Sequence, residues 1–205
     1  MSIVKLNNRG VRSATTFGSI TGLGSMTFIK KQTASSSATI SFVDGTSDVV
    51  LDDTYKEYLF TFKELHPSAD GGQLMVGFRD GSTAYDATKT TTCFKAYHAE
   101  DDAGQSLVYE AGNDMAQGTG VTFLSSNIDN DNDANCSGYL HLFNPASTTF
   151  VKHFIYTGVV LGATKYCYND FVAGYANVTA AIDGVQFSMN SGDIDAGDIC
   201  LYGIN

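Results

Sequence analysis

Apolar side chains occupy every second position along many segments of the chain. Tyr58, Phe60 and Phe62 follow this pattern in EYLFTF, and QLMVGF at 73–78 repeats it. A period of two is that of a β-strand with one buried face. The alternation predicts about ten strands, in segments 38–43, 57–62, 73–78, 93–99, 121–126, 138–144, 152–161, 171–178, 185–189 and 198–204.

Short turn-forming clusters separate these segments. Asp-Gly and Ser-Gly pairs such as Asp44-Gly45, Asp80-Gly81 and Ser191-Gly192 supply the positive φ that tight turns need. Only Gln105 to Met115 has helix-like spacing, and Gly112 interrupts it. Many strands with little helix predict an all-β fold, an antiparallel β-sandwich that is jelly-roll-like, with an N-terminal extended arm.

Charge divides the chain unevenly. Residues 1–43 contain five basic residues and no acidic one, whereas residues 44–205 contain 7 basic and 22 acidic residues. We therefore expect a basic arm at 1–34 and a single sandwich domain at 35–205. The arm could dock on an acidic partner surface, or it could supply a β-strand, either to a neighbouring subunit or to its own sandwich. A solvated strand and loop accounts for the charge pattern equally well. Particle-docking candidates are Lys5, Arg9 and Arg12.

Composition limits the classes of function. A net charge of -10 argues against nucleic acid as the main partner, because phosphate binding is driven by Lys and Arg. With 43% hydrophobic and 17% charged residues the chain is expected to fold. No apolar run reaches the length of about 18 residues that a membrane span needs, and the start has no apolar signal region. We expect neither a membrane span nor Sec export.

Cysteine spacing gives no metal motif. The chain has four cysteines without a CxxC pair, which excludes a zinc ribbon and favours reduced, buried thiols. They are Cys93, Cys136, Cys167 and Cys200.

An aspartate-rich run at 127–135 is the densest acidic segment. The alternating carboxylates of Asp129–Asp133 could offer oxygen ligands to Ca²⁺. An EF-hand loop fails, because Ala134 and Leu140 stand where Gly and Glu are required. A solvated hairpin loop and a calcium site are both compatible with the sequence, and we predict no metal site.

Catalytic motifs are missing. The chain has no GxSxG, no HExxH and no phosphate-binding glycine motif. His98 lies close to Glu100, Asp101 and Asp102 without a recognised ligand spacing, and His141 and His153 lie on strand-like segments. We expect a non-enzymatic protein without a cofactor, although a glycosidase needs only two well-placed carboxylates and no signature.

Aromatic residues are abundant but include no Trp. The 13 Phe and 11 Tyr residues are explained mostly by core packing. Tyr and Phe also stack on sugars and are common in protein interfaces. A carbohydrate-binding face and an oligomer interface therefore remain open.

Four stretches resemble small virion structural proteins of marine tailed bacteriophages, of the tail-fibre or head-decoration type. They are MSIVKLNNRGVRSATTFGSIT, DDTYKEYLFTFKELHPS, GYLHLFNPASTTFVKHF and the closing AAIDGVQFSMNSGDIDAGDICLYGIN. The ending is the most specific part, and the resemblance extends through the whole chain. It implies a non-enzymatic particle component, without distinguishing head from tail, and carries over no catalytic residues.

From this resemblance we expect a virion protein that is assembled in the host cytoplasm. It would be exposed as a receptor-binding knob or a capsid decoration protein. Its expected partners are other capsid or tail proteins and further copies of itself in a homotrimer, with a host surface glycan as a further partner. The alternative function is a carbohydrate-binding jelly-roll module acting on host surface glycans.

Overall fold

Two antiparallel β-sheets make up the part of the chain that the computed structural model describes, residues 25–163 and 165–205. The larger sheet contains nine strands, β1 (Met26–Thr33), β3 (Glu57–Pro67), β5 (Lys89–Ala99), β6 (Gln105–Tyr109), β7 (Met115–Gly118), β9 (Cys136–Phe143), β10 (Lys152–Leu161), β11 (Tyr166–Ala176) and β13 (Ile194–Ile204). The smaller sheet contains four strands, β2 (Ile40–Val43), β4 (Leu74–Arg79), β8 (Thr122–Phe123) and β12 (Gly184–Met189).

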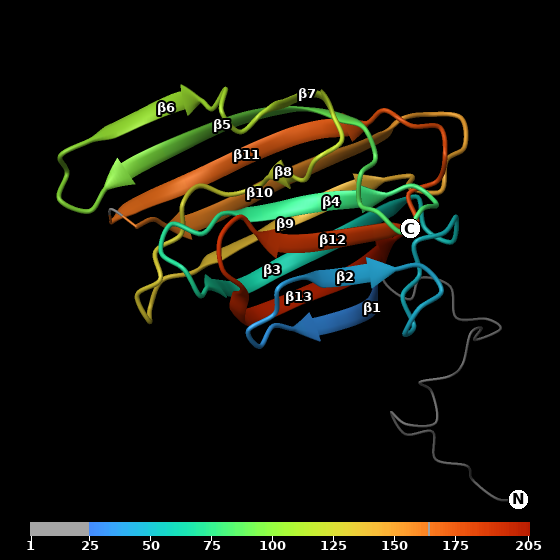
Figure 1. Cartoon of the computed structure of the whole chain (residues 1–205), viewed down its shortest axis with the longest axis horizontal. Helices are drawn as coiled ribbons and strands as arrows, with labels where there is room; N and C mark the ends of the chain where they lie inside the picture. Colours follow the sequence, from blue (N-terminus) through green and yellow to red (C-terminus); the bar gives the residue numbers. More distant parts are fainter. Residues whose placement is uncertain (1–24, 164) are drawn as a thin grey trace, which may run out of the picture.

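The strand order differs from the chain order in both sheets. The larger sheet runs β1-β13-β3-β9-β10-β11-β5-β6, with β7 also paired to β5, and the smaller runs β2-β12-β4-β8. In Figure 1 the smaller sheet lies in front of the larger one and leaves one end of β5, β6 and β11 uncovered. The predicted antiparallel β-sandwich is confirmed, and the jelly-roll-like connectivity stays a prediction.

The core lies between the two sheets and follows the alternation of the sequence. On β10, Phe154, Tyr156 and Val160 are buried, whereas Ile155 and Val159 between them are exposed. Buried positions of the larger sheet therefore define an inner face that packs on the smaller sheet. The opposite, outward-pointing positions form what we call the outer face.

An aromatic cluster joins the sheets. Phe187 on β12 lies 5.0 Å from Phe62 and 5.4 Å from Phe60 between ring centroids, and 6.4 Å from Phe42. The interplanar angles of 66° to 78° are edge-to-face arrangements, which stabilise aromatic pairs beyond area burial alone. Phe187 is therefore the centre of the contact between the layers.

Two buried lysines close one end of the core. Lys89 and Lys152 occupy one line across the sheet, since both lie opposite Ala176 of β11. Lys89 donates to the carbonyls of Ala87 and Gly120, and Lys152 donates to those of Val178 and Ala180. Burial lowers the pKa of Lys89 to about 8. Both ammonium groups hold neighbouring loops in place through hydrogen bonds to backbone carbonyl oxygens.

The candidate helix at Gln105 to Met115 is wrong. Residues 105–109 form β6 and residues 115–118 form β7, and both pair with β5. Hydrogen bonding to the open edge of β5 determines the conformation here, because Leu107 points to solvent rather than into a helical packing surface.

The arm expected at 1–34 differs from the structure in its second half. Met26–Thr33 is β1, which pairs with β13 at the edge of the larger sheet. Lys31 forms an ion pair with Asp198 at 3.2 Å, and Thr33 donates to the same carboxylate. These residues belong to the sandwich, as the strand-supplying alternative anticipates. Lys5, Arg9 and Arg12 lie outside the described residues.

Substitution of Phe187 tests the contact between the sheets. Phe187→Ala should lower the free energy of unfolding by about 3–5 kcal/mol, because it opens a cavity where three rings meet. Phe150→Ala is the matched control, since Phe150 is 69% exposed in a loop, and it should change stability by less than about 0.5 kcal/mol. Equal effects in chemical denaturation would contradict this packing.

Candidate binding groove

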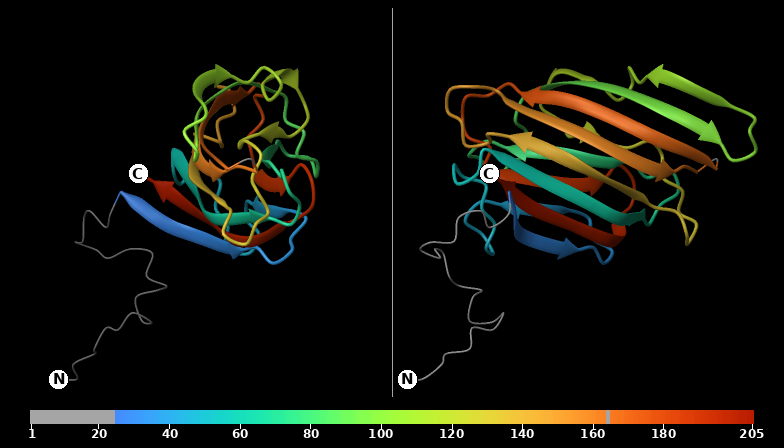
Figure 2. Two further views of the ribbon diagram at one scale, coloured as in Figure 1. Left: turned by 90° about the vertical axis from the view of Figure 1, so that its left-hand side faces the viewer. Right: turned by 180° about the vertical axis from the view of Figure 1, so that it is seen from behind.

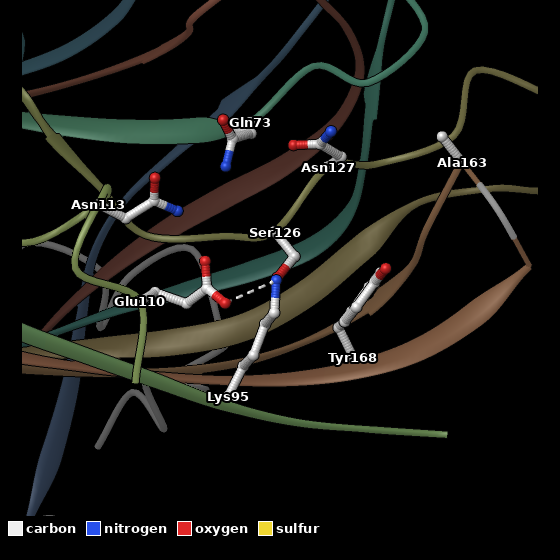
Figure 3. A pocket seen from close by; sticks show the side chains of 8 residues that line it. All are labelled: Gln73, Lys95, Glu110, Asn113, Ser126, Asn127, Ala163 and Tyr168. Carbon is white, nitrogen blue, oxygen red and sulfur yellow. Dashed lines mark ion pairs between the residues drawn. The ribbon is translucent and has the colours of Figure 1, made fainter. Parts of the chain in front are cut away.

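Two adjoining hollows open on the inner side of the larger sheet, at the end that the smaller sheet leaves uncovered. Their volumes are about 320 and 570 Å³, and they share Lys95, Glu110 and Tyr168. We call them together the groove, with a polar half (Figure 3) and an aromatic half. The polar half is lined also by Gln73, Asn113, Ser126, Asn127 and Ala163, and the aromatic half by Tyr97, Val108, Tyr109 and Tyr166.

Strand register brings the floor of the groove together. On β5 and β11, Tyr97 lies opposite Tyr168, and Lys95 lies opposite Asp170. Directly opposed residues of an antiparallel pair point to the same side. These residues continue the line of buried Cys93 and Val172. The positions that build the core at one end therefore build the groove at the other.

A cation lies at the junction of the two halves. The Nζ atom of Lys95 is 3.2 Å from Oε1 of Glu110 and 4.9 Å from the ring centroid of Tyr168. Both charged side chains are largely buried, with 18% and 28% exposure. The ion pair and the cation–π contact together hold Lys95 in one place.

Asp170 supports the polar half from below. One of its oxygens accepts from the backbone N–H of Ser126 and the other accepts from the Ser126 hydroxyl, both at 2.7 Å. Burial raises the pKa of Asp170 above its ordinary value. The carboxylate fixes the loop after β8, on which Ser126 and Asn127 reach the groove.

Side-chain amides line the rim of the polar half. Gln73 is held by Asn190 and donates to the carbonyl of Ser125. The amides of Asn113 and Asn127 make no hydrogen bond to another described residue, and Asn127 is exposed. They present both donors and acceptors to whatever enters the groove.

Three tyrosines build the aromatic half. Tyr166 and Tyr168 lie 5.7 Å apart at an interplanar angle of 25°, and Tyr97 meets each of them edge-on at 5.4 and 5.9 Å. Gly162 leaves room for the Tyr168 ring, because a Cβ atom at that position would lie 2.2 Å from it. Any larger residue at position 162 would therefore displace the Tyr168 ring.

The charged groups of the groove are paired, and its other lining groups are suited to binding a ligand. Glu110 is paired with Lys95, and both oxygens of Asp170 accept from Ser126. Both carboxylates are therefore engaged by neighbouring groups of the groove. The groove instead offers aromatic rings beside amide and hydroxyl groups.

The aspartate run, whose carboxylates could offer ligands to Ca²⁺, binds a lysine side chain in this structure. Lys165 donates to Asp129 at 2.8 Å and to Asp131 at 2.7 Å. The hydrogen bond from Lys165 lowers the pKa of Asp129. Within residues 25–163 and 165–205, no group of three or more His, Cys, Asp or Glu side chains is arranged to bind a metal ion.

The histidine candidates do not form a common site. His98 contacts Asp102 at 3.1 Å on the surface, and β5 ends before Glu100. His141 pairs with Glu57 on the outer face, and His153 lies beside Tyr175.

The prediction of reduced cysteines agrees with the structure, and the prediction that they are buried holds for two of the four. All four cysteines are free thiols, and Cys93 and Cys136 are buried. Burial raises the pKa of each of these two thiols to about 12. Cys167 is exposed and Cys200 is half-buried, so these two are not core residues.

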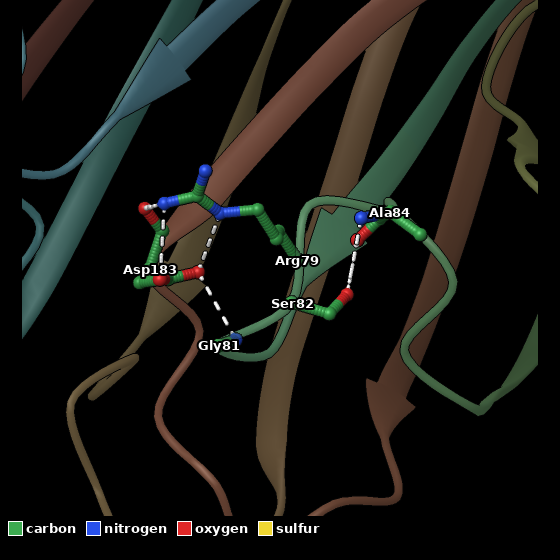
Figure 4. A network of polar contacts seen from close by, with 5 residues as sticks. All are labelled: Arg79, Gly81, Ser82, Ala84 and Asp183. Carbon is green, nitrogen blue, oxygen red and sulfur yellow. Dashed lines mark hydrogen bonds and ion pairs between the residues drawn. The ribbon is translucent and has the colours of Figure 1, made fainter.

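A further polar network connects the smaller sheet to its turns. Arg79 binds the Asp183 carboxylate through two nitrogens, at 2.8 and 3.0 Å, and the backbone N–H of Gly81 donates to the same carboxylate (Figure 4). The hydrogen bonds that Arg79 donates to Asp183 raise the pKa of Arg79. This fork-to-carboxylate pair stabilises the β4 turn against the start of β12.

The outer face carries exposed apolar side chains across the sheet. Figure 2 shows it from behind, where no other described segment lies across it. The exposed members are Met26, Phe28, Phe94, Leu107, Tyr109, Tyr139, Ile155 and Val159. Thr90, Thr92, His153, Ile155, Ala173 and Tyr175 contribute to a shallow hollow of about 420 Å³ on the same face.

Charge is missing from the middle of this face. The outward positions of β5, β9, β10 and β11 contain no Asp, Glu, Lys or Arg. The charged residues of these strands all belong to the inward set, namely Lys89, Lys95, Lys152 and Asp170. In a chain with 22 acidic residues, such a surface is unusual for a protein that stays alone in water.

Comparison with models of known protein families, with curated proteins and with solved structures gave no match for this chain. No helix in the described part of the chain is suited to crossing a membrane. The candidate binding surfaces of the protein are the groove and the outer face, and the observations that support both come from this structure.

Replacement of Asp170 tests how the groove is supported. The folded state binds the Asp170 proton more tightly than the unfolded chain does, so this residue's contribution to stability falls as pH rises from 3.8 through the raised pKa. In Asp170→Asn the amide oxygen can accept from the Ser126 N–H and the amide NH2 can donate to the Ser126 hydroxyl oxygen, so both contacts remain. This variant should be more stable than the wild type at pH 7, with the difference vanishing in acid.

Asp170→Ala is the contrasting variant. It leaves the N–H and hydroxyl of Ser126 without partners and should cost about 1–3 kcal/mol. Thermal unfolding of both variants between acid and neutral pH measures this. A less stable Asp170→Asn at pH 7 would contradict the account of the buried carboxylate.

Proposed function

We propose that this protein is a non-enzymatic structural component of a tailed-phage virion, exposed on the particle as a tail-fibre or receptor-binding knob or as a capsid decoration protein. The four stretches that resemble virion proteins of marine phages support the proposal. The outer face is the structural observation that carries it, because a repeated particle component needs a surface for neighbouring subunits. The protein would be assembled in the host cytoplasm.

The outer face has the properties of a subunit interface. Its centre is free of formal charge, and Phe94, Tyr139 and Ile155 lie exposed on it. Interface cores are depleted in charge and enriched in aromatic residues. We assign further copies of this chain as the partner, in a homotrimer, since an acidic protein with a net charge of -10 can approach itself most closely where charge is absent.

The alternative function is a carbohydrate-binding module that acts on host surface glycans. The groove favours it, because tyrosine rings and side-chain amides meet there in one open hollow. The two functions are compatible, since the groove lies on the inner side of the larger sheet and the subunit interface lies on the outer side.

Charge substitutions on the outer face test its role in assembly. Ile155→Glu and Val159→Glu should each weaken self-association by about 100-fold or more, because each buries a carboxylate without a partner. Phe150→Glu carries the same change of charge in a loop between β9 and β10 and should leave association unchanged. Light scattering after size exclusion measures the mass. A monomeric wild type, or equal behaviour of all three variants, would contradict the interface.

Immunogold labelling tests the virion assignment itself. Antibody against residues 44–205 should place gold on intact particles, over the head for a decoration protein or at the tail for a fibre. Label that remains only in the cleared lysate would refute the virion component and leave the free carbohydrate-binding module.

A further inference from the structure

We propose that the groove binds a segment of a neutral oligosaccharide, with a sugar ring packed on the tyrosines of the aromatic half and its hydroxyl groups bound in the polar half. This inference rests on the alternative, carbohydrate-binding function of the groove, which it deepens, and it does not depend on the assembly role. It assigns a ligand class to the site and excludes charged glycans from it.

The dimensions of the groove fit a chain rather than a compact molecule. Its two halves, of about 320 and 570 Å³, adjoin along the ends of β5 and β11 and are open to solvent. An open trough admits a polymer from either end, whereas binding sites for small cofactors bury most of the ligand surface. The hollows together are large enough for more than one sugar ring.

The groove matches the two kinds of surface that a sugar presents. The C–H groups of a pyranose ring pack on aromatic rings. Tyr97, Tyr166 and Tyr168 line the aromatic half as one cluster, in which Tyr166 and Tyr168 stack on each other at 5.7 Å. Sugar hydroxyl groups both donate and accept, and so do the amides of Asn113 and Asn127, which have no partner among the described residues. Both surfaces therefore meet complementary groups within one hollow.

The charges around the groove select a neutral ligand. Lys95 is paired with Glu110 at 3.2 Å, and Lys165 is occupied by Asp129 and Asp131. Glu100 and Asp101 lie beside Tyr166 in the next hollow. A sulfate or uronate would meet these carboxylates without an unpaired cation among the described groove residues. The same arrangement disfavours the phosphates of nucleic acids.

Preorganisation supports a binding role. The register of β5 and β11 fixes Tyr97 opposite Tyr168, and Asp170 fixes the loop that carries Asn127 through two hydrogen bonds to Ser126. Rings and loop are held before a ligand arrives, which lowers the entropy cost of binding.

The test uses the full-length protein and a glycan array. The array holds neutral oligosaccharides, such as glucans, mannans and N-acetylglucosamine oligomers, together with sulfated and uronate-containing chains. We expect binding to neutral chains, confirmed by titration calorimetry with the best one. Tyr168→Ala should weaken this binding by about five- to tenfold, and Asn127→Ala should weaken it as well.

Two controls separate binding from folding and from assembly. Tyr168→Phe keeps the ring and should keep most of the affinity, and Phe150→Ala changes an exposed aromatic residue at a loop far from the groove. Ile155→Glu should bind sugar with unchanged affinity per chain, since it alters only the outer face.

Binding confined to sulfated or uronate chains would overturn the ligand class. Neutral binding that survives both Tyr168→Ala and Asn127→Ala would overturn the site, and a wild type that binds no glycan on the array would overturn the inference altogether. None of these results bears on the subunit mass or on the gold labelling, which test the proposed function separately.

Discussion

The unequal size of the two sheets is the constraint on which the rest of this structure depends. A sheet of four strands covers only part of a sheet of nine, and a β-sheet is stable when at least one face is buried. Phe187 and its three aromatic neighbours bury the part that is covered. The smaller sheet does not cover the far end of the inner face or any of the outer face. The side chains differ between these two surfaces, because the first is polar and the second is apolar.

At the uncovered end of the inner face, polar side chains replace apolar ones while the strands keep their regular pairing. The alternation of β5 and β11 continues, but Lys95 and Asp170 replace the apolar residues that occupy the same line further along. Each charged group is satisfied, one by Glu110 and the other by Ser126. A hydrated hollow can persist there because satisfied polar groups do not drive collapse. The outer face stays apolar, and the outward positions of its central strands carry no Asp, Glu, Lys or Arg, as the proposed subunit interface requires.

The sequence was sufficient for the core of the fold, because alternation at 57–62, 152–161 and 198–204 reflects a face that must be buried. It was insufficient at β1, β6 and β7. MTFIKKQT carries charges on an edge strand, and 105–115 has helix-like spacing that Gly112 interrupts, so pairing with β13 and β5 determined both segments. The resemblance to phage virion proteins suggested a particle component, but it named no surface.

The groove was missed for a different reason. Gln73, Lys95, Glu110, Ser126 and Tyr168 are far apart in the chain and meet only through register and loop placement. The local signals that did attract attention, the aspartate run and the histidines, proved to be a lysine-bound loop and separate surface pairs. One signal was available in the sequence, since Lys95 and Tyr97 stand in the alternating segment 93–99 in line with Cys93, where core residues are expected. Tyr166 and Tyr168 lie before the strand predicted at 171–178.

Thiol labelling of Cys167 tests the central claim, that assembly covers the outer face. Cys167 is exposed on that face of β11, opposite His98 of β5. Labelling is followed by mass spectrometry at Cys167 alone, in the assembled wild type and in Ile155→Glu at the same concentration. The account predicts a protected thiol in the wild type and rapid labelling in the variant. Equal labelling rates in the two proteins would contradict it.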